Sequence, residues 1–272
     1  MKKKMSRSTL ILILVFLVGL SLLLYPSISN YWNSFHASRA VASYSETVET
    51  LDEADRTRIW NAAQAYNQTL TTQPNRYHMT DQQRAAYHAT LDVSGTGVIG
   101  TIEIPAIKVS LPIYHGVDEA VLQIAVGHIE GTSLPVGGES THCVLSGHRG
   151  LPSAKLFTNL DELVEGDVFM IQVLDEVLTY EVDQILIVEP EDVSALEIQE
   201  GQDLCTLVTC TPYGVNTHRL LVRGHRIENL DPDYIRVTAE ALPIDPILVA
   251  PLVAAPILVL LFVADMVKYR KK

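Results

Sequence analysis

Three side chains in the second half of the chain have the types and surroundings that acyl transfer requires. Cys210 ends the β-branched run "TLVTC", Arg219 follows nine residues later in a second such run, and His148 stands in "SGHRG" after an apolar segment. A thiol nucleophile needs an imidazole to exchange protons with, and an attacked carbonyl needs a cation or N–H groups for its negative oxygen. The three residues supply these roles if the strands ending at His148 and Cys210 are neighbours and the strand starting at His218 pairs back. Spacing alone leaves open a buried, hydrophobe-like cysteine and a solvated arginine.

The other cysteines follow a matching pattern. Cys143 precedes His148 by five residues, just as Cys205 precedes Cys210 by five. Five residues along one strand place Cys205 and Cys210 on opposite faces, so they cannot easily bridge each other. If the two strands are parallel neighbours, Cys143 and Cys205 are adjacent in the core. We predict two buried free thiols there, because a cross-strand disulfide has strained geometry.

The elements that must position these residues change character along the chain. Residues 30–94 have helical spacing and predict two amphipathic helices, with Asp52 as a possible cap, and a third short helix opened by a Thr80–Gln83 capping box. From Gly95 to residue 229, short β-branched or alternating runs are separated by Gly, Pro, Asp and Asn. These runs favour a mainly β domain, as a closed barrel rather than a sandwich, with short helical inserts. The "GTGVIG" that opens this region precedes a strand-like segment, so its glycines predict a turn and not a nucleotide site.

Both ends of the chain have the composition of membrane segments. Residues 1–29 combine a basic start with an uncharged run from Leu10 to Tyr25, and predict a cytoplasmic tail with a retained signal anchor. Residues 230–246 read as a linker, 247–267 predict a transmembrane helix, and 268–272 form a second basic tail. Because basic flanks stay cytoplasmic, the part between the two segments is expected on the extracellular side of the cell membrane.

Charge and motif spacing exclude several classes of function. The chain carries a formal net charge of −12, and its basic ends make the middle more acidic still, which disfavours nucleic acid as a partner. None of the nine histidines has a zinc-binding spacing. We therefore predict no metal and no cofactor.

Longer motifs carry a resemblance to a known family. The segments "TLVTCTPYGVNTHRLLVRGHR", "STHCVLSGHRGLPSAKLFTNLDEL", "LPIYHG" and "GHIEGTSLPVGG" are similar to the sortases, specifically the pilus-assembling class C sortases of Gram-positive bacteria. The resemblance covers about Gly97 to Arg226. It implies an eight-stranded sortase β-barrel with a catalytic cysteine at Cys210, histidine at His148 and arginine at Arg219.

The same resemblance implies a transpeptidation reaction. Cys210 would cleave an LPXTG-like sorting signal between Thr and Gly, form a thioester, and pass the acyl group to a lysine amine of the next pilin subunit. The partners would then be pilins with sorting signals and acceptor lysines. Two alternatives remain: a sortase that anchors single proteins to cell-wall peptidoglycan, and an inactive barrel that binds sorting signals.

One feature of the class is missing from this sequence. Class C members usually carry an Asp-Pro-aromatic lid motif ahead of the barrel, but Leu70 to Val93 contain no such triplet. Pro74 and Tyr77 are the nearest substitutes, and "DPDY" at Asp231 follows the barrel. Whether this segment covers Cys210 is left open by the sequence.

Overall fold

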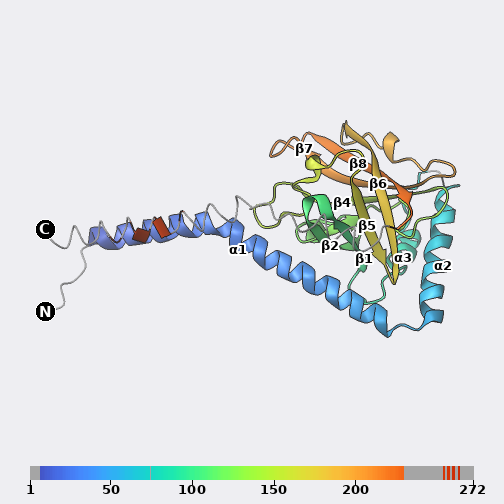
Figure 1. Ribbon diagram of the computed structural model, residues 1–272, viewed down its shortest axis with the longest axis horizontal. Coiled ribbons are helices and arrows are strands. Elements are labelled where there is room, and N and C mark those ends of the chain that lie inside the picture. The colour runs from blue at the N-terminus through green and yellow to red at the C-terminus, as the bar shows by residue number, and fades with distance from the viewer. Residues whose placement is uncertain are drawn as a thin grey trace.

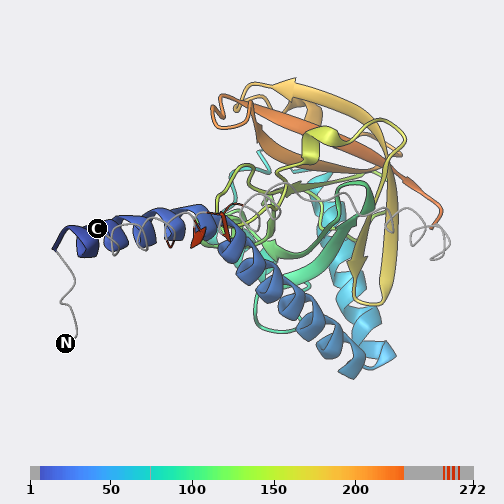
Figure 2. The ribbon, with the colours of Figure 1, turned by 60° about the vertical axis from the view of Figure 1, so that its left-hand side comes forward.

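The protein is described here from a computed structural model covering residues 7–73 and 75–229, together with positions 254, 256, 257, 259, 260 and 263. A closed barrel forms the body of the molecule, and a long helix, α1, runs along it and projects beyond it toward the N-terminus (Figure 1; the same arrangement from a second side in Figure 2). The predicted linker 230–246, the basic tail 268–272 and most of the predicted span 247–267 lie outside the described residues.

Helix α1 extends without a break from Arg7 to Thr50. Its most apolar window has a mean hydropathy of 2.6, so by length and composition this helix can cross a membrane. The predicted boundary between residues 29 and 30 does not interrupt it, and Pro26 lies inside it. The helix continues because Ala37, Tyr44 and Val48 pack into the barrel's core cluster, and such packing outweighs the one hydrogen bond that proline removes.

Two further helices precede the barrel, and both begin where the sequence predicts. In α2, Glu53–Leu70, the Asp52 carboxylate accepts a hydrogen bond from the Asp55 backbone N–H at 2.7 Å. In α3, Asp81–His88, Thr80 and Gln83 form the predicted reciprocal capping box. These caps satisfy N–H groups that the first helical turn leaves unpaired, which fixes where each helix starts.

The barrel closes in the strand order β1-β2-β3-β4-β7-β8-β6-β5. Neighbouring strands are antiparallel except for the parallel pairs β2 with β3 and β4 with β7. This closed barrel with short helical inserts is the predicted architecture, and one insert, at Leu160–Glu162, is a single 3-10 turn. The strands are β1 Val98–Ile104, β2 Val109–His115, β3 Val126–His128, β4 Thr141–Ser146, β5 Val168–Val173, β6 Glu176–Val188, β7 Asp203–Thr211 and β8 His218–Ile227; short helices lie at Pro105–Ile107, α4 Glu119–Leu122, Leu160–Glu162 and Ser194–Leu196.

The wall made by β4 and β7 has an apolar inner face and a second apolar cluster on its outer face. On the inner face Cys143 and Cys205 are register partners, both buried and both free thiols, as predicted. Burial raises the pKa of the Cys205 thiol well above its ordinary value, so it stays protonated. On the outer face, Val144 and Val208 pack with Leu196 and Leu221. The two faces therefore separate a sealed core from an outer surface on which other chemistry can be placed.

Candidate active site

The strand register brings the three predicted site residues to one end of the barrel wall. Strands β4 and β7 pair in parallel up to Ser146 and Val208, and the Gly147 N–H donates to the Val208 carbonyl at 3.1 Å. His148 and Cys210 each lie two residues beyond that last pair. Cys210 is in turn the register partner of Arg219 on β8. The end of β4, the end of β7 and the start of β8 are called the site edge below.

Alternation along the strands places Cys210 on the outer face of the barrel. Val208, two residues earlier, belongs to the outer apolar cluster, whereas Leu207 belongs to the barrel core. Because side chains two residues apart share a face, Cys210 shares that of Val208. The Cys210 side chain is half-buried, in contrast to the fully buried Cys205. A thiol in this position is accessible and has an apolar floor beside it.

Gly147 fixes the path of the chain into His148. An added Cβ at this position would lie 2.7 Å from the ring of Phe157, so only glycine allows the backbone to pass so close. The Phe157 N–H then donates to the His148 carbonyl at 3.1 Å, and the Thr209 hydroxyl donates to the Gly147 carbonyl at 2.8 Å. These bonds hold the histidine loop against the end of β7.

Arg149 is a component of the site edge for which no role was predicted from the sequence. Its side chain is 9% exposed and pairs with Asp161, and it also lies 3.5 Å from the Thr211 hydroxyl. The guanidinium carbon stands 5.7 Å from the centre of the Tyr213 ring. Arg149 therefore ties the histidine loop to the residues directly after Cys210. Its position beside a predicted catalytic histidine in "GHRG" was the only signal for it.

A carboxylate lies next to the candidate histidine. The His148 Nε2 atom is 3.8 Å from an oxygen of Glu119, at the start of α4, and 28% of the histidine side chain is exposed. Glu119 is itself 75% exposed, so its attraction for a protonated imidazole is weakened by solvent. Sequence reasoning missed this contact because α4 is reached through a different pair of strands.

Arg219 points its guanidinium at backbone oxygens of the β7–β8 loop. Its Nη1 atom donates to the carbonyls of His218 at 3.1 Å and Asn216 at 3.4 Å. Within residues 7–73 and 75–229, no carboxylate forms an ion pair with it. Arg219 is thus the register partner of Cys210, and its guanidinium has donors left for a substrate oxygen.

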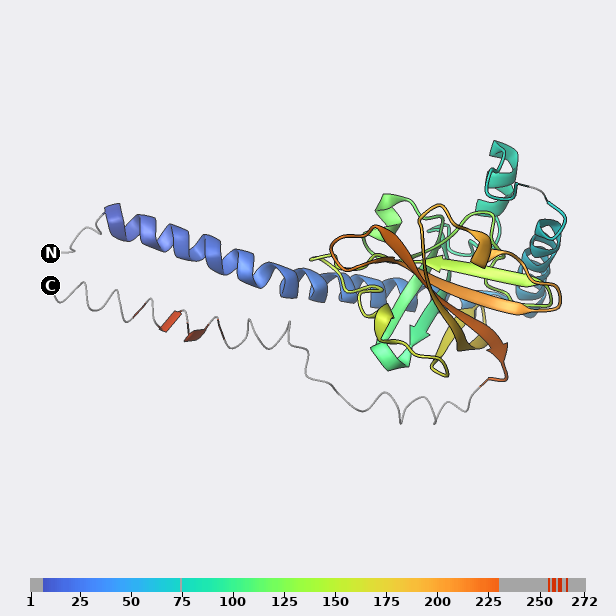
Figure 3. The same cartoon turned by 90° about the horizontal axis from the view of Figure 1, so that it is seen from above.

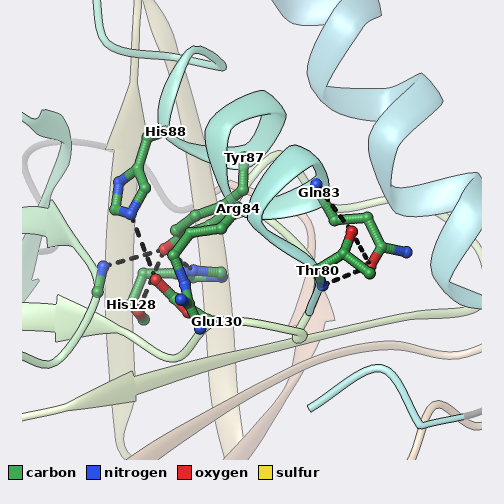
Figure 4. A network of polar contacts seen from close by, with 8 residues as sticks. Thr80, Gln83, Arg84, Tyr87, His88, His128 and Glu130 are labelled. Atoms are coloured by element: carbon green, nitrogen blue, oxygen red, sulfur yellow. Dashed lines mark hydrogen bonds and ion pairs between the residues drawn. The ribbon is translucent and has the colours of Figure 1, made fainter. Parts of the chain in front are cut away.

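A buried polar network anchors α3 against β2 and β3 (Figure 4). The Tyr87 hydroxyl lies 2.8 Å from Nδ1 of His128 and accepts a hydrogen bond from the Gly116 N–H at 3.1 Å. Burial, with smaller contributions from His128 and His88, lowers the pKa of His115 to about 3, so it stays neutral. Among the described residues, no group of three His, Cys, Asp or Glu side chains is placed to hold a metal ion. These histidines serve the structure of the barrel.

The segment expected to hold a lid contacts a different part of the molecule. Arg76 donates to the Leu196 carbonyl at 3.0 Å and pairs with Glu197 at 3.1 Å. The Glu197 carbonyl in turn contacts His142, near the start of β4. No hydrogen bond or ion pair joins the described residues 70–93 to His148, Cys210 or Arg219, and Pro74 lies outside the described residues. Tyr77 lies over Arg76, its ring centre 4.9 Å from the guanidinium carbon.

Comparison with known proteins gives consistent matches to one family. Residues 102–227 match the family described as Sortase domain. The crystal structure of sortase C1 from Streptococcus agalactiae is similar with a TM-score of 0.69 and 53% identity, over 71% of this chain and 100% of that one. Sortase C of Streptococcus pneumoniae has a TM-score of 0.65 and 47% identity, over 71% of this chain and 99% of that one.

A more distant relative matches over a shorter part of the chain. Sortase D of Bacillus subtilis is 33% identical over 131 residues, which are 47% of this chain and 63% of the relative. The chain therefore spans slightly less than two thirds of that protein's length. The matches to both class C structures extend beyond the barrel into the helical region before it.

Proposed function

The chain belongs to the sortase family of cysteine transpeptidases, and on this premise we propose that it polymerises pilin subunits. In this proposal the donor is an LPXTG-like sorting signal and the acceptor is a lysine amine of the next pilin. The observation that carries the proposal is the register at the site edge: Cys210 opposite Arg219, with His148 at the end of the strand parallel to β7. The class C relatives support the choice of pilins, since the pneumococcal structure concerns pilin substrate specificity.

The first half of the reaction forms a thioester. The Cys210 thiolate attacks the carbonyl carbon of the signal's threonine, and the carbonyl oxygen becomes an oxyanion. When the carbon–nitrogen bond to glycine breaks, the His148 imidazolium gives its proton to the leaving amine. The acyl group remains on Cys210, and the glycine fragment leaves with a neutral amino terminus.

The second half transfers the acyl group to an amine. The lysine nitrogen attacks the thioester carbonyl, His148 takes the proton that this nitrogen loses, and the Cys210 thiolate leaves. The product is an isopeptide bond between two subunits. A thioester suits this exchange because it keeps enough acyl energy to react with an amine.

Arg219 would stabilise the oxyanion in both halves. Arg219 is the register partner of Cys210, and its guanidinium has no carboxylate partner among the described residues, so its charge is available to a substrate. Hydrogen-bond donors fixed in advance at a developing negative charge are among the largest contributions to catalysis. Arg219 can also hold the backbone of the sorting signal.

We further propose that α1 anchors the enzyme in the cell membrane with the barrel on the extracellular side. The helix is long and apolar enough to span a bilayer. Lys2, Lys3, Lys4 and Arg7 precede the apolar run, and basic flanks remain on the cytoplasmic side.

Purified full-length enzyme and two pilin forms test the function. We expect enzyme with a pilin carrying a sorting signal and acceptor lysine to give a covalent ladder on denaturing gels. The matched control is the same pilin with that lysine replaced by arginine, which should stop at the thioester or at hydrolysis. Transfer only to a peptidoglycan-stem amine would favour the wall-anchoring alternative. A sorting-signal peptide that blocks thiol labelling but forms no thioester would favour the inactive, binding-only barrel.

A further inference from the structure

Helix α1 connects the apolar run directly to the loop that follows His148. The Asn33 side chain donates to the Ser153 carbonyl at 2.9 Å, and the Asn30 side-chain oxygen accepts from the Lys155 N–H at 2.9 Å. Ser153 and Lys155 belong to the loop that begins at the site edge and closes at Phe157. Counted from the apolar run, the histidine loop (residues 147–157) is therefore where these contacts between α1 and the barrel begin.

The rise per residue of α1 gives the distance of each end of the barrel from the end of the apolar run, measured along the helix axis. Asn30 comes five residues after Tyr25, the end of the apolar run, which corresponds to about 8 Å along a helix. The Tyr44 hydroxyl accepts from the Leu174 N–H, at the β5–β6 turn, and this contact lies roughly 20 Å further along the axis. The histidine loop is thus close to the end of the apolar run, and the β5–β6 turn is far from it.

The β7–β8 loop lies on the same side as the histidine loop. Arg149 links the two loops through its contacts with Thr211 and the Tyr213 ring. Viewed from above, the β7–β8 loop points toward the N-terminal half of α1, whereas α2 and α3 lie at the opposite side of the barrel (Figure 3). Figure 1 shows the same arrangement from a perpendicular direction.

An exposed apolar stripe continues from the apolar run along α1. Tyr25, Ile28, Trp32 and Phe35 follow each other at intervals of three and four residues and are 55%, 62%, 62% and 48% exposed. They lie on one face of the helix, while Asn30, Asn33 and Ala37 face the barrel. Tryptophan and tyrosine are enriched where a membrane meets water, because their rings are amphipathic. Tyr213 and Val215 of the β7–β8 loop are also exposed, at 60% and 66%.

We propose that this outer stripe lies in the bilayer interface and that the site edge of the barrel faces the lipid surface. The inference rests on the proposed membrane anchoring by α1. The stripe is assigned to the bilayer because it is continuous with the apolar run and carries the aromatic rings typical of a membrane interface. The reactive end of the barrel is then held low over the membrane, and the end formed by the β5–β6 turn is held high.

Energy transfer to labelled lipid headgroups tests the orientation. The protein is the full-length Cys210→Ala variant in nanodiscs. A donor dye is attached at Val215→Cys in the β7–β8 loop or, as the matched control, at Glu200→Cys before the start of β7. The buried Cys143 and Cys205 do not compete for the label. We expect higher transfer efficiency from position 215 than from position 200. Equal efficiencies, or the reverse order, would overturn the proposal.

A further variant makes this result specific. A seven-residue helical insertion after Ser29 raises the barrel by about 10 Å and should lower the energy transfer from position 215. The same insertion in enzyme that retains Cys210 should leave cleavage of a soluble sorting-signal peptide normal. Unchanged transfer would contradict the inference. Loss of peptide cleavage in the parent enzyme would instead refute the proposed function, without affecting the transfer measurement.

The stripe itself has a direct readout. In Trp60→Phe protein, Trp32 is the remaining tryptophan, and lipids brominated near the headgroup should quench its emission. Absence of quenching would overturn the lipid assignment. Self-association abolished by Trp32→Ser would also overturn it, in favour of a second copy of this chain on the stripe.

Discussion

Two rows of residues on the outer face of one barrel wall contain similar side chains but have different environments. The distal row consists of His142, Thr206 and Arg223, and the site row of His148, Cys210 and Arg219. Each row has a histidine in or just after β4, a residue with a hydroxyl or thiol group on β7, and an arginine on β8 that is the register partner of the β7 residue. Residue type alone therefore does not distinguish a structural row from a reactive one.

Each side chain of the distal row has a polar partner. His142 is fully buried, with Nδ1 at 2.9 Å from the Glu197 carbonyl and Nε2 at 2.7 Å from the Thr206 hydroxyl. Arg223 makes two hydrogen bonds to Asp183, at 2.9 and 3.0 Å. In the site row the histidine and the thiol are partly exposed, and among the described residues Arg219 donates hydrogen bonds to the backbone carbonyls of Asn216 and His218 and to no carboxylate. The proposed catalytic groups are thus ones that the fold positions but leaves more accessible than their distal counterparts.

The largest expected difference lies between the two cysteines of β7. Cys210→Ala should reduce thioester formation and polymer assembly to background, because it removes the nucleophile. Cys205→Ala should retain acyl transfer and lose on the order of 1 kcal/mol of stability, since it removes one buried sulfur. Mass spectrometry of the acyl-enzyme and urea unfolding of both variants provide the check. Polymer formation by folded Cys210→Ala protein would refute the role of Cys210.

The two arginines of β8 provide a second comparison of the rows, with a smaller expected loss of activity. Arg219→Lys should lower kcat/KM by roughly 10²–10³-fold, the usual loss when one stabilising donor group is removed from an oxyanion. Arg223→Lys should keep near-normal kcat/KM and lose some stability, because it breaks a paired fork with Asp183. Steady-state kinetics with a sorting-signal peptide and an amine acceptor measure both. Near-normal turnover in Arg219→Lys would show that this arginine is structural.

The third prediction concerns acid stability, not turnover, and belongs to the distal row. Burial, opposed in part by the Glu197 carbonyl, lowers the pKa of His142 from 6.5 to about 4. The unfolded chain therefore binds a proton first as pH falls, so stability present above pH 6.5 is lost progressively toward pH 4, by on the order of 3 kcal/mol. His142→Gln should flatten this part of the pH dependence of the urea midpoint. An unchanged slope in that variant would contradict the assignment.

The sequence predicted which residues would come together at the site edge, partly from local signals and partly from the family resemblance, and the register brings them to one end of the wall. Strand-ending runs and the Gly-flanked turn marked Cys210, Arg219 and His148, and the equal spacing of the cysteines predicted that Cys143 and Cys205 are neighbours; the register shows that they are. Both helix caps were also predictable, since a cap depends on residues three positions apart. What links these signals is that each can be evaluated within one or two neighbouring segments.

Features formed by tertiary packing could not be found in this way. The unbroken α1 depends on burial of Ala37, Tyr44 and Val48 against the barrel. The contacts of Arg149 with Asp161 and Tyr213, and of Glu119 with His148, join residues whose neighbourhood appears only when the barrel closes. The path of the segment around Arg76 depends likewise on Leu196 and Glu197, far along the chain.

The parallel pairing of β4 with β7 also determines when the site edge is assembled during folding. The bond between Thr209 and Gly147 joins residues 62 positions apart, and such non-local contacts form late because a long stretch of chain must first be ordered. His148, Cys210 and Arg219 are therefore brought to one end of the barrel only after the strands that carry them have paired. If acyl transfer depends on all three, as proposed, a newly made, still unfolded chain cannot carry it out.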